Sequence, residues 1–422
     1  MATVLAPAAR PALRTGTCRF CGTALGHSFA DLGVTPPANA YLKEADLRRP
    51  EIFYPLHAYV CESCFLVQLE EFASPDQLFT DYAYFSSYSE TWLRHAEAYA
   101  ETAAQRFGLG GASRVVEVAS NDGYLLQFFV GKGIPVLGIE PAANVARHAE
   151  ARGVRTLVRF FGRATARKLV QDGWRADLLI ANNVLAHVPN LNDFVAALRI
   201  ALKSDGVATL EFPHLMRLIE QGQFDTIYHE HFSYFSFLTA ERVFAAHGLR
   251  LFDVEALPTH GGSLRIYACH AESGHASGAA VERLRAAERA AGLDRLAVYE
   301  GFGPRIARIK RRFLAFLIEA KEAGKSVVGY GAAAKGNTLL TTSGASPDLI
   351  DYVADANPHK QGLYLPGTHI PICSPERIAE TRPDYVVILP WNLKHEIMDQ
   401  MASVRGWGGH FVIAIPELTV LP

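Results

Sequence analysis

From Ser113 onward, apolar strand-like runs alternate with segments whose apolar residues recur at helical spacing. This alternation is typical of a parallel sheet covered by helices on both faces. The predicted strands lie at 114–119, 135–140, 177–183 and 206–213, with a final pair at 250–256 and 263–269. Helices are expected at 91–107, from Tyr124, at 191–202 and at 239–247. The order of these segments predicts a seven-stranded α/β core.

A second alternating region follows residues 274–324, which are rich in Ala, Arg and Glu at helical spacing and predict helices. Residues 326–331 form a predicted strand that enters a glycine turn, and Lys335-Gly336-Asn337 opens a helix. Further strands are expected at 349–354, 385–389 and 411–415. The pattern therefore predicts a second Rossmann-like unit at the C-terminus.

Four of the six cysteines form two C-x2-C pairs, Cys18 with Cys21 and Cys61 with Cys64. The turn within each pair presents both thiolates to one point, and two such pairs complete the tetrahedral four-sulfur site that Zn²⁺ prefers. Four thiolates leave no open coordination position, so we expect a structural zinc ion that takes no part in chemistry. His27 and His57 remain alternative ligands.

The turn after the first predicted strand favours a cofactor that has a ribose but no phosphate. It reads Ser120-Asn121-Asp122-Gly123, with one glycine where a dinucleotide pyrophosphate needs G-x-G-x-x-G. Glu140 closes the second strand, where an acid accepts hydrogen bonds from two ribose hydroxyls. S-adenosylmethionine fits these requirements. We expect its site at the strand ends, formed by Glu117, Ala119, Asn121, Asp122, Gly123, Glu140, Pro141, Asn182 and Asn183.

The densest group of proton-handling side chains is the run Tyr228-His229-Glu230-His231, inside an otherwise aromatic segment. An imidazole titrates near neutrality, so beside a carboxylate and a phenol it can take a proton from a weakly acidic carbon. A surface loop and a metal site at His229 and His231 are the alternatives. On a strand, Glu230 and His231 would face opposite sides, so both can enter one pocket only if the segment is a turn or a helix.

The composition adds limits on partners. The chain has 422 residues, 49% of them hydrophobic and 20% charged, with a formal net charge of -2. These values are typical of a globular protein of two or three domains and give no electrostatic footprint for nucleic acid or an anionic membrane. No apolar stretch reaches the length of a membrane span, and the first seventeen residues lack a continuous apolar core. We expect a cytoplasmic monomer without nucleic-acid or membrane partners.

Several motifs in combination resemble the sugar C-methyltransferases, and above all the members that methylate C-3. The motifs are the paired cysteines, residues 117–123, Ala186-His187-Val188-Pro189-Asn190, Tyr228 to Phe232, Thr259 to Arg265 and Gly329 to Thr338. The resemblance runs from Cys18 to the C-terminus. It implies a small zinc-binding domain (18–75), a class I S-adenosylmethionine-dependent methyltransferase core (76–275) and a C-terminal α/β domain (325–422) that binds a nucleotide sugar. The residues themselves predict a flexible arm (1–17) and a helical linker (276–324).

The resemblance also implies the reaction. Members of this family methylate a nucleotide-linked 4-keto-deoxysugar through an enolate, with His231 as the base and Tyr82, His187, Tyr228 and Glu230 as its companions. We expect the substrate to contact His260, Gly261, Gly262, Ser263, Lys335 and Asn337, its diphosphate lying at the backbone amides of 334–337 and at Lys335. The alternative function is a zinc-ribbon-containing methyltransferase of RNA or protein.

Overall fold

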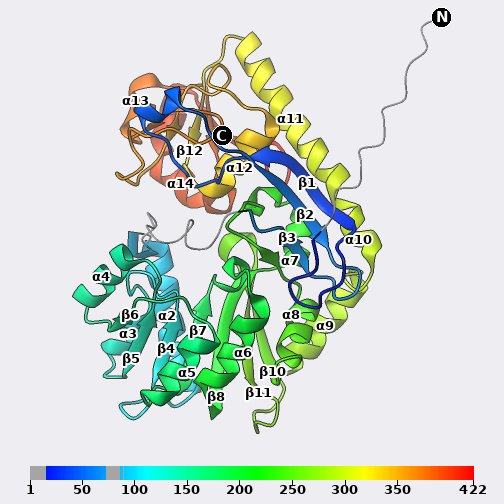
Figure 1. The fold of residues 1–422 in the computed structure, drawn as a ribbon. Coiled ribbons are helices and arrows are strands. Elements are labelled where there is room, and N and C mark those ends of the chain that lie inside the picture. Colours follow the sequence, from blue (N-terminus) through cyan, green and yellow to red (C-terminus); the bar gives the residue numbers. More distant parts are fainter. Residues whose placement is uncertain (1–15, 73–85, 89) are drawn as a thin grey trace, which may run out of the picture.

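The structure is a computed structural model that describes residues 16–72, 86–88 and 90–422. A central sheet fills the lower part of the view in Figure 1, and the C-terminal sheet lies above it. A third, N-terminal sheet runs between them beside the long helix α11 (Phe302–Glu322). Among the described residues, no helix combines the length and the apolar character needed to span a bilayer.

The central sheet has seven strands in the order β10-β11-β8-β7-β4-β5-β6. All neighbouring strands are parallel except β11, which is antiparallel to both β10 and β8. The strands are β4 (Val115–Val118), β5 (Val136–Ile139), β6 (Thr156–Leu157), β7 (Ala176–Asn182), β8 (Leu202–Pro213), β10 (Leu249–Leu257) and β11 (Ser263–His270). The six predicted strands are confirmed. The two-residue β6 was missed because so short a strand has no periodic signal.

Helices pack against both faces of this sheet, as the alternating pattern predicts. They include the confirmed helices α2 (Glu90–Arg106), α3 (Leu126–Val130), α6 (Leu191–Ala201) and α8 (Phe237–Ala245), and the further helices α4 (Ala143–Ala151) and α5 (Arg163–Gln171). Helix α7 (Leu215–Gln221) instead packs in the core that the N-terminal and C-terminal sheets share. Leu178, Leu179 and Ile180 of β7 are fully buried, which explains why this strand reads as a continuous apolar run.

The N-terminal sheet is antiparallel and takes its last strand from a distant part of the chain. Its order is β1-β2-β3-β9, with β1 (His27–Thr35), β2 (Tyr54–Val60), β3 (Val67–Leu69) and β9 (Ser233–Tyr234). Val67 pairs with Tyr234 and Gln68 with Ser233. The segment that follows His231 is thereby bonded to the cysteine-rich part of the chain.

The C-terminal sheet has the order β14-β13-β12-β15-β16-β17, parallel except for β17. Its strands are β12 (Val327–Tyr330), β13 (Val353–Ala354), β14 (Ile372–Cys373), β15 (Tyr385–Ile388), β16 (His410–Ile413) and β17 (Thr419–Leu421), and its helices are α12 (Ala334–Ser343), α13 (Glu376–Thr381) and α14 (Lys394–Gln400). The second Rossmann-like unit is confirmed. The predicted strand at 349–354 is confined to β13.

The expected linker contains α9 (Ala279–Ala290), α10 (Leu296–Glu300) and α11. Phe302 and Phe313 of α11 share one core with Phe29 of β1 and Val327 of β12. Burial of such apolar surface contributes about 25 cal/mol per Å². This helix is therefore a packing element between the N-terminal and C-terminal sheets.

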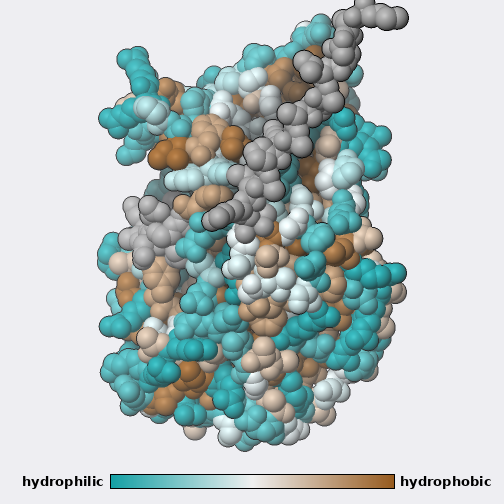
Figure 2. Space-filling view, turned by 45° about the vertical axis from the view of Figure 1, so that its right-hand side comes forward, coloured by the Kyte–Doolittle hydropathy of each residue, from teal (hydrophilic) through white to brown (hydrophobic). Residues whose placement is uncertain are grey.

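Short 3-10 helices complete the fold: η1 (Glu44–Arg48), η2 (Ser86–Tyr88), η3 (Leu185–His187), η4 (Phe224–Thr226), η5 (Thr259–Gly261), η6 (Trp391–Leu393) and η7 (Ala402–Trp407). The outline in Figure 2 is indented on the left, between the upper and lower parts of the molecule. Hydrophobic residues gather along the lower edge of the upper part on this face.

Candidate active site and zinc centre

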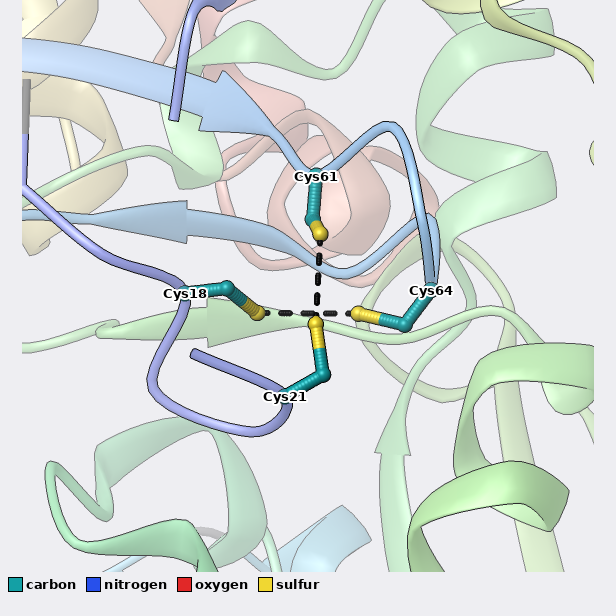
Figure 3. A group of neighbouring side chains, drawn as sticks. All are labelled: Cys18, Cys21, Cys61 and Cys64. Atoms are coloured by element: carbon teal, nitrogen blue, oxygen red, sulfur yellow. Dashed lines mark hydrogen bonds between the residues drawn. The ribbon is translucent and has the colours of Figure 1, made fainter. Parts of the chain in front are cut away.

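The four predicted zinc ligands lie together. One ligand atom from each of Cys18, Cys21, Cys61 and Cys64 lies within 4.8 Å of the other three, and Figure 3 shows the sulfur atoms converging. Cys18 Sγ is 3.6 Å from Cys64 Sγ, and Cys21 Sγ is 3.5 Å from Cys61 Sγ. A tetrahedral centre with Zn–S bonds of about 2.3 Å brings its sulfurs to about 3.8 Å from one another. The cysteines therefore fit a zinc ion.

The two cysteine pairs adopt one turn conformation. The Gly22 amide donates to the Cys18 carbonyl and the Phe65 amide donates to the Cys61 carbonyl, each at 2.9 Å. Gly22 and Phe65 then have φ values of 76° and 60°. The turns thus take the chain through the left-handed region directly after the second ligand, a conformation that a glycine adopts easily and a phenylalanine rarely.

The alternative ligands point elsewhere. His27 Nε2 lies 3.2 Å from Glu62 Oε2, and His57 Nε2 lies 2.8 Å from Ser28 Oγ. Gln68 Nε2 instead donates to Cys18 Sγ at 3.1 Å, and its own strand pairs with β9. The cysteine cluster is therefore joined through Gln68 to the strand that follows His231.

The residues expected to bind the cofactor lie at the carboxyl ends of β4, β5 and β7, which are neighbours in the sheet. Glu117 is in β4, Glu140 and Pro141 follow β5, and Asn182 ends β7. Ala119, Asn121 and Asn183 have φ values of 53°, 50° and 55°. Non-glycine residues in this region are strained and cluster at functional sites. The structure brings the whole predicted set to one edge.

Glu140 shapes this edge through two backbone contacts. Its carboxylate accepts from the Asn121 amide at 3.0 Å and from the Ala142 amide at 2.9 Å. Each carboxylate oxygen keeps a further lone pair, so ribose hydroxyls can still bind there. Burial raises the pKa of Glu140, and these two amides oppose the rise.

Three buried acceptor atoms at this edge have no hydrogen-bond partner within the described ranges: Glu117 Oε2, Asp122 Oδ1 and Asn182 Oδ1. Burial, followed by the charges of Glu140 and Asp122, raises the pKa of Glu117 well above its usual range. Buried polar atoms are normally paired, so such a group of acceptors calls for a donor. S-adenosylmethionine carries an ammonium, an adenine amine, two ribose hydroxyls and a sulfonium, and it fits this edge.

Asp122 and Gly123 also have structural tasks. The Asp122 carboxylate is buried and lies 2.8 Å from Arg152 NH1. Gly123 has a φ of 79°, and a Cβ there would come within 3.1 Å of Val154 and 3.3 Å of Ala149. This glycine is required for the left-handed turn and for the close approach of α4 and the segment after it.

The run Tyr228 to His231 forms a turn, closed by the His231 amide, which donates to the Tyr228 carbonyl at 2.8 Å. His231 Nδ1 lies 2.8 Å from the Thr226 carbonyl oxygen, and Nε2 lies 2.8 Å from the Tyr228 hydroxyl. A carbonyl can only accept, so Nδ1 carries the proton and Nε2 keeps the lone pair. Burial, followed by His187, lowers the pKa of His231 well below its usual range.

His187 lies across from the predicted base. Its ring centroid is 4.6 Å from that of His231 in an edge-to-face arrangement. Burial lowers the pKa of His187 to about 4, and a hydrogen bond with the Glu230 backbone opposes this change. Both imidazoles are therefore neutral at neutral pH. Tyr82, the fifth predicted catalytic residue, lies outside the described residues.

The turn sends its other two polar side chains toward the N-terminal sheet. His229 Nε2 lies 3.1 Å from the Pro55 carbonyl oxygen, so His229 and His231 do not point to a common ligand position. Glu230 Oε1 accepts from Asn39 Nδ2 at 2.8 Å. Burial raises the pKa of Glu230 to about 7, against the effect of Asn39.

The predicted substrate residues come from two places. His260, Gly261 and Gly262 have φ values of 55°, 87° and 115° and form a tight turn before Ser263, whose hydroxyl donates to the Thr259 carbonyl at 3.0 Å. Burial, followed by Lys335, lowers the pKa of His260 to about 4. A Cβ at Gly261 would lie 2.4 Å from the Trp391 ring, so the turn and η6 touch.

Lys335 and Asn337 open α12, which lies at the lower edge of the C-terminal unit (Figure 1). Lys335 Nζ donates to Asn392 Oδ1 at 2.8 Å and lies 4.8 Å from the centre of the Trp391 ring. The Asn337 amide is used inside the helix, where it donates to the Ala333 carbonyl at 3.0 Å. Lys335 therefore lies where the C-terminal unit meets the unit built on the central sheet.

Sequence reasoning missed two contributors to this region. Asn39 contacts Glu230 from 191 positions away, and Trp391 donates to Asp225 Oδ2 at 2.7 Å from 166 positions away. Burial raises the pKa of Asp225 to about 6, opposed first by the charge of Lys335. Neither contact has a local sequence signal, because each depends on how distant segments pack.

Three family models match this chain. "Putative zinc binding domain" matches residues 18–79, "Methyltransferase domain" matches residues 92–254, and "C-methyltransferase C-terminal domain" matches residues 258–416. The chain is also 35% identical to "C-methyltransferase NovU" of Streptomyces niveus over 404 residues, which are 96% of each chain.

Two solved methyltransferases resemble part of the chain more distantly. Magnesium protoporphyrin IX methyltransferase from Synechocystis PCC 6803, with bound S-adenosylmethionine, is 13% identical with a TM-score of 0.33, and the match covers 42% of this chain and 79% of that chain. The CcbJ methyltransferase from Streptomyces caelestis is 14% identical with a TM-score of 0.34, over 42% of this chain and 89% of that chain. A likeness at this level says nothing about the substrate.

The relative and the family models together decide between the expected functions. They favour C-methylation over a methyltransferase of RNA or protein. S-adenosylmethionine is the methyl donor that the methyltransferase part takes, and the four cysteines hold a structural zinc ion. With 35% identity over 96% of its length, the chain belongs to the C-methyltransferase family.

Proposed function

We propose that this C-methyltransferase acts at C-3 of a nucleotide-linked 4-keto-deoxysugar and that His231 removes the C-3 proton. The observation that carries the proposal is the arrangement of His231. Its Nδ1 is committed to the Thr226 carbonyl, and burial keeps the pKa of the ring low. A neutral imidazole with a fixed tautomer is the form that can act as a general base.

The substrate class follows from what such a base can do. A ketone at C-4 acidifies the neighbouring C-3 hydrogen, because the electron pair left on carbon delocalises onto the ketone oxygen. An unactivated sugar carbon offers no comparable acidity to an imidazole. A positioned general base contributes about 10²- to 10⁴-fold to such a step. Carbon methylation at this site therefore requires a carbonyl next to the reacting carbon.

Tyr228 has two positions in this proposal. In the structure its hydroxyl lies 2.8 Å from His231 Nε2. When the substrate enters, the hydroxyl turns to the C-4 oxygen and leaves Nε2 to face C-3. His187 lies across from His231 in the same site, and Glu230, whose pKa is raised by burial, is a donor that Asn39 holds in place.

At the carboxyl edge of the central sheet, S-adenosylmethionine supplies an electrophilic methyl group. Glu140 holds the ribose hydroxyls, and Glu117, Ala119, Asn121, Asp122, Gly123, Pro141, Asn182 and Asn183 surround the rest of the molecule. The backbone strain at Ala119, Asn121 and Asn183 supports this assignment. The chain's own contribution is to hold donor and acceptor at reacting distance and to exclude water.

The sugar nucleotide would lie between the turn at His260, Gly261, Gly262 and Ser263 and the start of α12 with Lys335 and Asn337. This placement divides the chain as the sequence suggests, into an arm (1–17), a zinc-binding domain (18–75), the methyltransferase core (76–275), a helical linker (276–324) and a nucleotide-sugar-binding domain (325–422). We further propose that the protein acts as a cytoplasmic monomer, without nucleic acid as a partner.

The test is hydrogen exchange at C-3. The protein is incubated in D2O with TDP-, CDP- and GDP-linked 4-keto-6-deoxysugars, first alone and then with S-adenosylmethionine, and the products are read by mass spectrometry and NMR. We expect C-3 deuteration without the methyl donor and a new methyl group on C-3 with it. His231→Asn should slow both by about 10³-fold. A methyl group found on oxygen or nitrogen would contradict the proposal.

A further inference from the structure

Lys335 is a partly buried lysine whose charge has no direct carboxylate contact within the described ranges. Its Nζ donates to the neutral amide oxygen of Asn392 at 2.8 Å and lies 4.8 Å from the centre of the Trp391 ring. Burial lowers the pKa of Lys335, and the charge of Asp225 opposes this change. Asp225 Oδ2 accepts from Trp391 Nε1 at 2.7 Å. Burial of a cation without a paired carboxylate carries a desolvation penalty, so its retention here suggests a functional role.

Lys335 belongs to the same cluster of side chains as the proposed base. Asp225 and Thr226 are neighbours in η4, and the Thr226 carbonyl holds His231 Nδ1 at 2.8 Å. Trp391, which lies against Lys335, also touches the turn that carries His260. Burial is the largest cause of the low pKa values of His231 and His260, and the charge of Lys335 also lowers each of them.

Three imidazoles near the proposed base, those of His187, His231 and His260, are neutral at neutral pH, and the nearby Arg265 is paired with Glu211 and Glu255. Burial lowers the pKa values of His187 and His260 to about 4 and lowers the pKa of His231 well below its usual range. An enolate places a full negative charge on the former ketone oxygen, and a pre-positioned cation is the strongest means of stabilising it. Lys335 is the group that can provide this charge.

We propose that the ammonium group of Lys335 binds the C-4 oxygen of the substrate and stabilises the enolate, instead of binding the diphosphate. The inference rests on the proposed function. His231 Nε2 takes the C-3 proton, the C–H electron pair forms the C-3–C-4 double bond, and the carbonyl π pair moves to the oxygen that faces Lys335. When C-3 bonds to the methyl carbon, the oxygen returns its pair to the carbonyl and the methyl–sulfur bond pair stays on sulfur. His231 then releases its proton to solvent.

The decisive variant is Lys335→Met, which keeps most of the side-chain volume and removes the charge. We expect the rate of C-3 deuterium exchange at saturating sugar nucleotide and kcat to fall by about 100-fold, as when an oxyanion donor is removed. The KM values of both substrates should stay within about 3-fold, since neither is held mainly by this charge. Lys325→Met is the matched control: Lys325 is an exposed lysine of the same unit, paired with Asp384 at 2.9 Å.

Two measurements keep the test decisive. Loss of the Lys335 charge should also move the acid limb of the exchange rate to higher pH, because the lysine lowers the pKa of His231. A structural role would not move that limb. If Lys335→Met does not fold, as judged by circular dichroism and S-adenosylmethionine binding, Lys335→Gln takes its place in both measurements.

Opposite outcomes separate this inference from the proposed function. A KM for the sugar nucleotide that rises more than 10-fold, with unchanged exchange at saturation, would assign Lys335 to the diphosphate and overturn the inference. An acid limb that stays in place would overturn it too. If the wild-type protein itself gives no exchange with any 4-ketosugar, the proposed function fails and the inference falls with it.

Discussion

The turns that follow β4 and β12 occupy equivalent places in two parallel sheets, and each is held by an acid that follows the next strand. Glu140 accepts from the amides of Asn121 and Ala142, and Asp355 accepts from the amides of Ala332 and Asn357 at 2.7 Å and 2.8 Å. Up to this point, the two units are built alike.

They differ in what lies beside the acid. Lys360 Nζ is 3.5 Å from Asp355 and donates to the Ala332 carbonyl, which also accepts from the Tyr41 hydroxyl at 2.6 Å. In the turn that follows β12, called the upper turn, side chains of the protein therefore satisfy the hydrogen-bonding groups of Ala332. Beside the turn that follows β4, Arg152 pairs with Asp122 at 2.8 Å, while burial and then the charges of Glu140 and Asp122 raise the pKa of Glu117. The same architecture thus gives an acidic edge that suits a cationic cofactor after β4, and a turn whose polar groups are occupied by the protein's own side chains after β12.

Removal of zinc should have the largest effect. It should impair proton removal at His231 and leave S-adenosylmethionine binding almost unchanged. A structural zinc ion contributes about 10 kcal/mol to its fold, so chelation should disrupt the sheet in which β3 pairs with β9 and displace His231. We expect C-3 exchange to fall by about 10³-fold while the Kd for S-adenosylmethionine, measured by calorimetry, changes less than about 3-fold, because the cofactor edge belongs to the central sheet. Restored zinc should restore exchange. If cofactor affinity fell in parallel with exchange, the proposed S-adenosylmethionine site on the central sheet would depend on the zinc centre.

The matched acids give the next largest effect. Glu140→Ala should weaken S-adenosylmethionine binding by about 100-fold, since two charge-assisted hydrogen bonds to the ribose and two backbone contacts are lost. Asp355→Ala should leave that Kd unchanged and lower the free energy of unfolding by about 2 kcal/mol, because it strands the Ala332 and Asn357 amides and the Lys360 charge. Calorimetry and urea unfolding measure the two quantities. Equal effects of both substitutions on cofactor affinity would contradict the contrast between the turns.

Local sequence signals were sufficient for six of the seven strands of the central sheet. The strands carry continuous apolar runs because both faces are buried, and Glu140 stands at a strand end whose position the fold fixes. The zinc ligands could also be predicted from the sequence, because the spacing of Cys18, Cys21, Cys61 and Cys64 alone identifies a four-sulfur site. Strands of two residues, such as β6 and β14, carry no such signal.

Packing between distant segments was not accessible in this way. The pairing of β9 with β3 and the contact of Asn39 with Glu230 join residues more than 160 positions apart. The contacts of Tyr41 and Lys360 with the Ala332 carbonyl, in the turn after β12, are likewise tertiary, because neither residue adjoins that turn in the sequence. The run Tyr228 to His231 was recognisable in the sequence as a group of proton-handling side chains, whereas the burial that sets their pKa values was not.

Glu230 allows a smaller test through pH. Its pKa is raised from 4.5 to about 7, so its contribution to stability is fully present below pH 4.5 and is lost as the pH rises through 7. A shift of this size corresponds to about 3 kcal/mol. Glu230→Gln should therefore gain stability relative to the wild type as the pH rises from 4.5 to 7.5 in urea unfolding. The exposed acid Glu220, changed to Gln, is the control. A constant difference across this range would show that Glu230 is not buried in its acid form.

Tyr41→Phe should produce the smallest effect, since the Tyr41 hydroxyl contacts the Ala332 carbonyl at 2.6 Å and, more loosely, Asn39 Oδ1 at 3.4 Å. It removes one hydrogen bond to the Ala332 carbonyl, which Lys360 Nζ still satisfies at 2.8 Å, so the free energy of unfolding should fall by about 1 kcal/mol. Tyr299→Phe, which removes a 2.7 Å bond to the Leu293 carbonyl, calibrates the loss of one buried phenol bond elsewhere. Neither variant should change the Kd for S-adenosylmethionine, because the upper turn holds no part of the cofactor edge. A weaker cofactor affinity in Tyr41→Phe alone would mean that the two turns communicate and that closure of the upper one serves the lower.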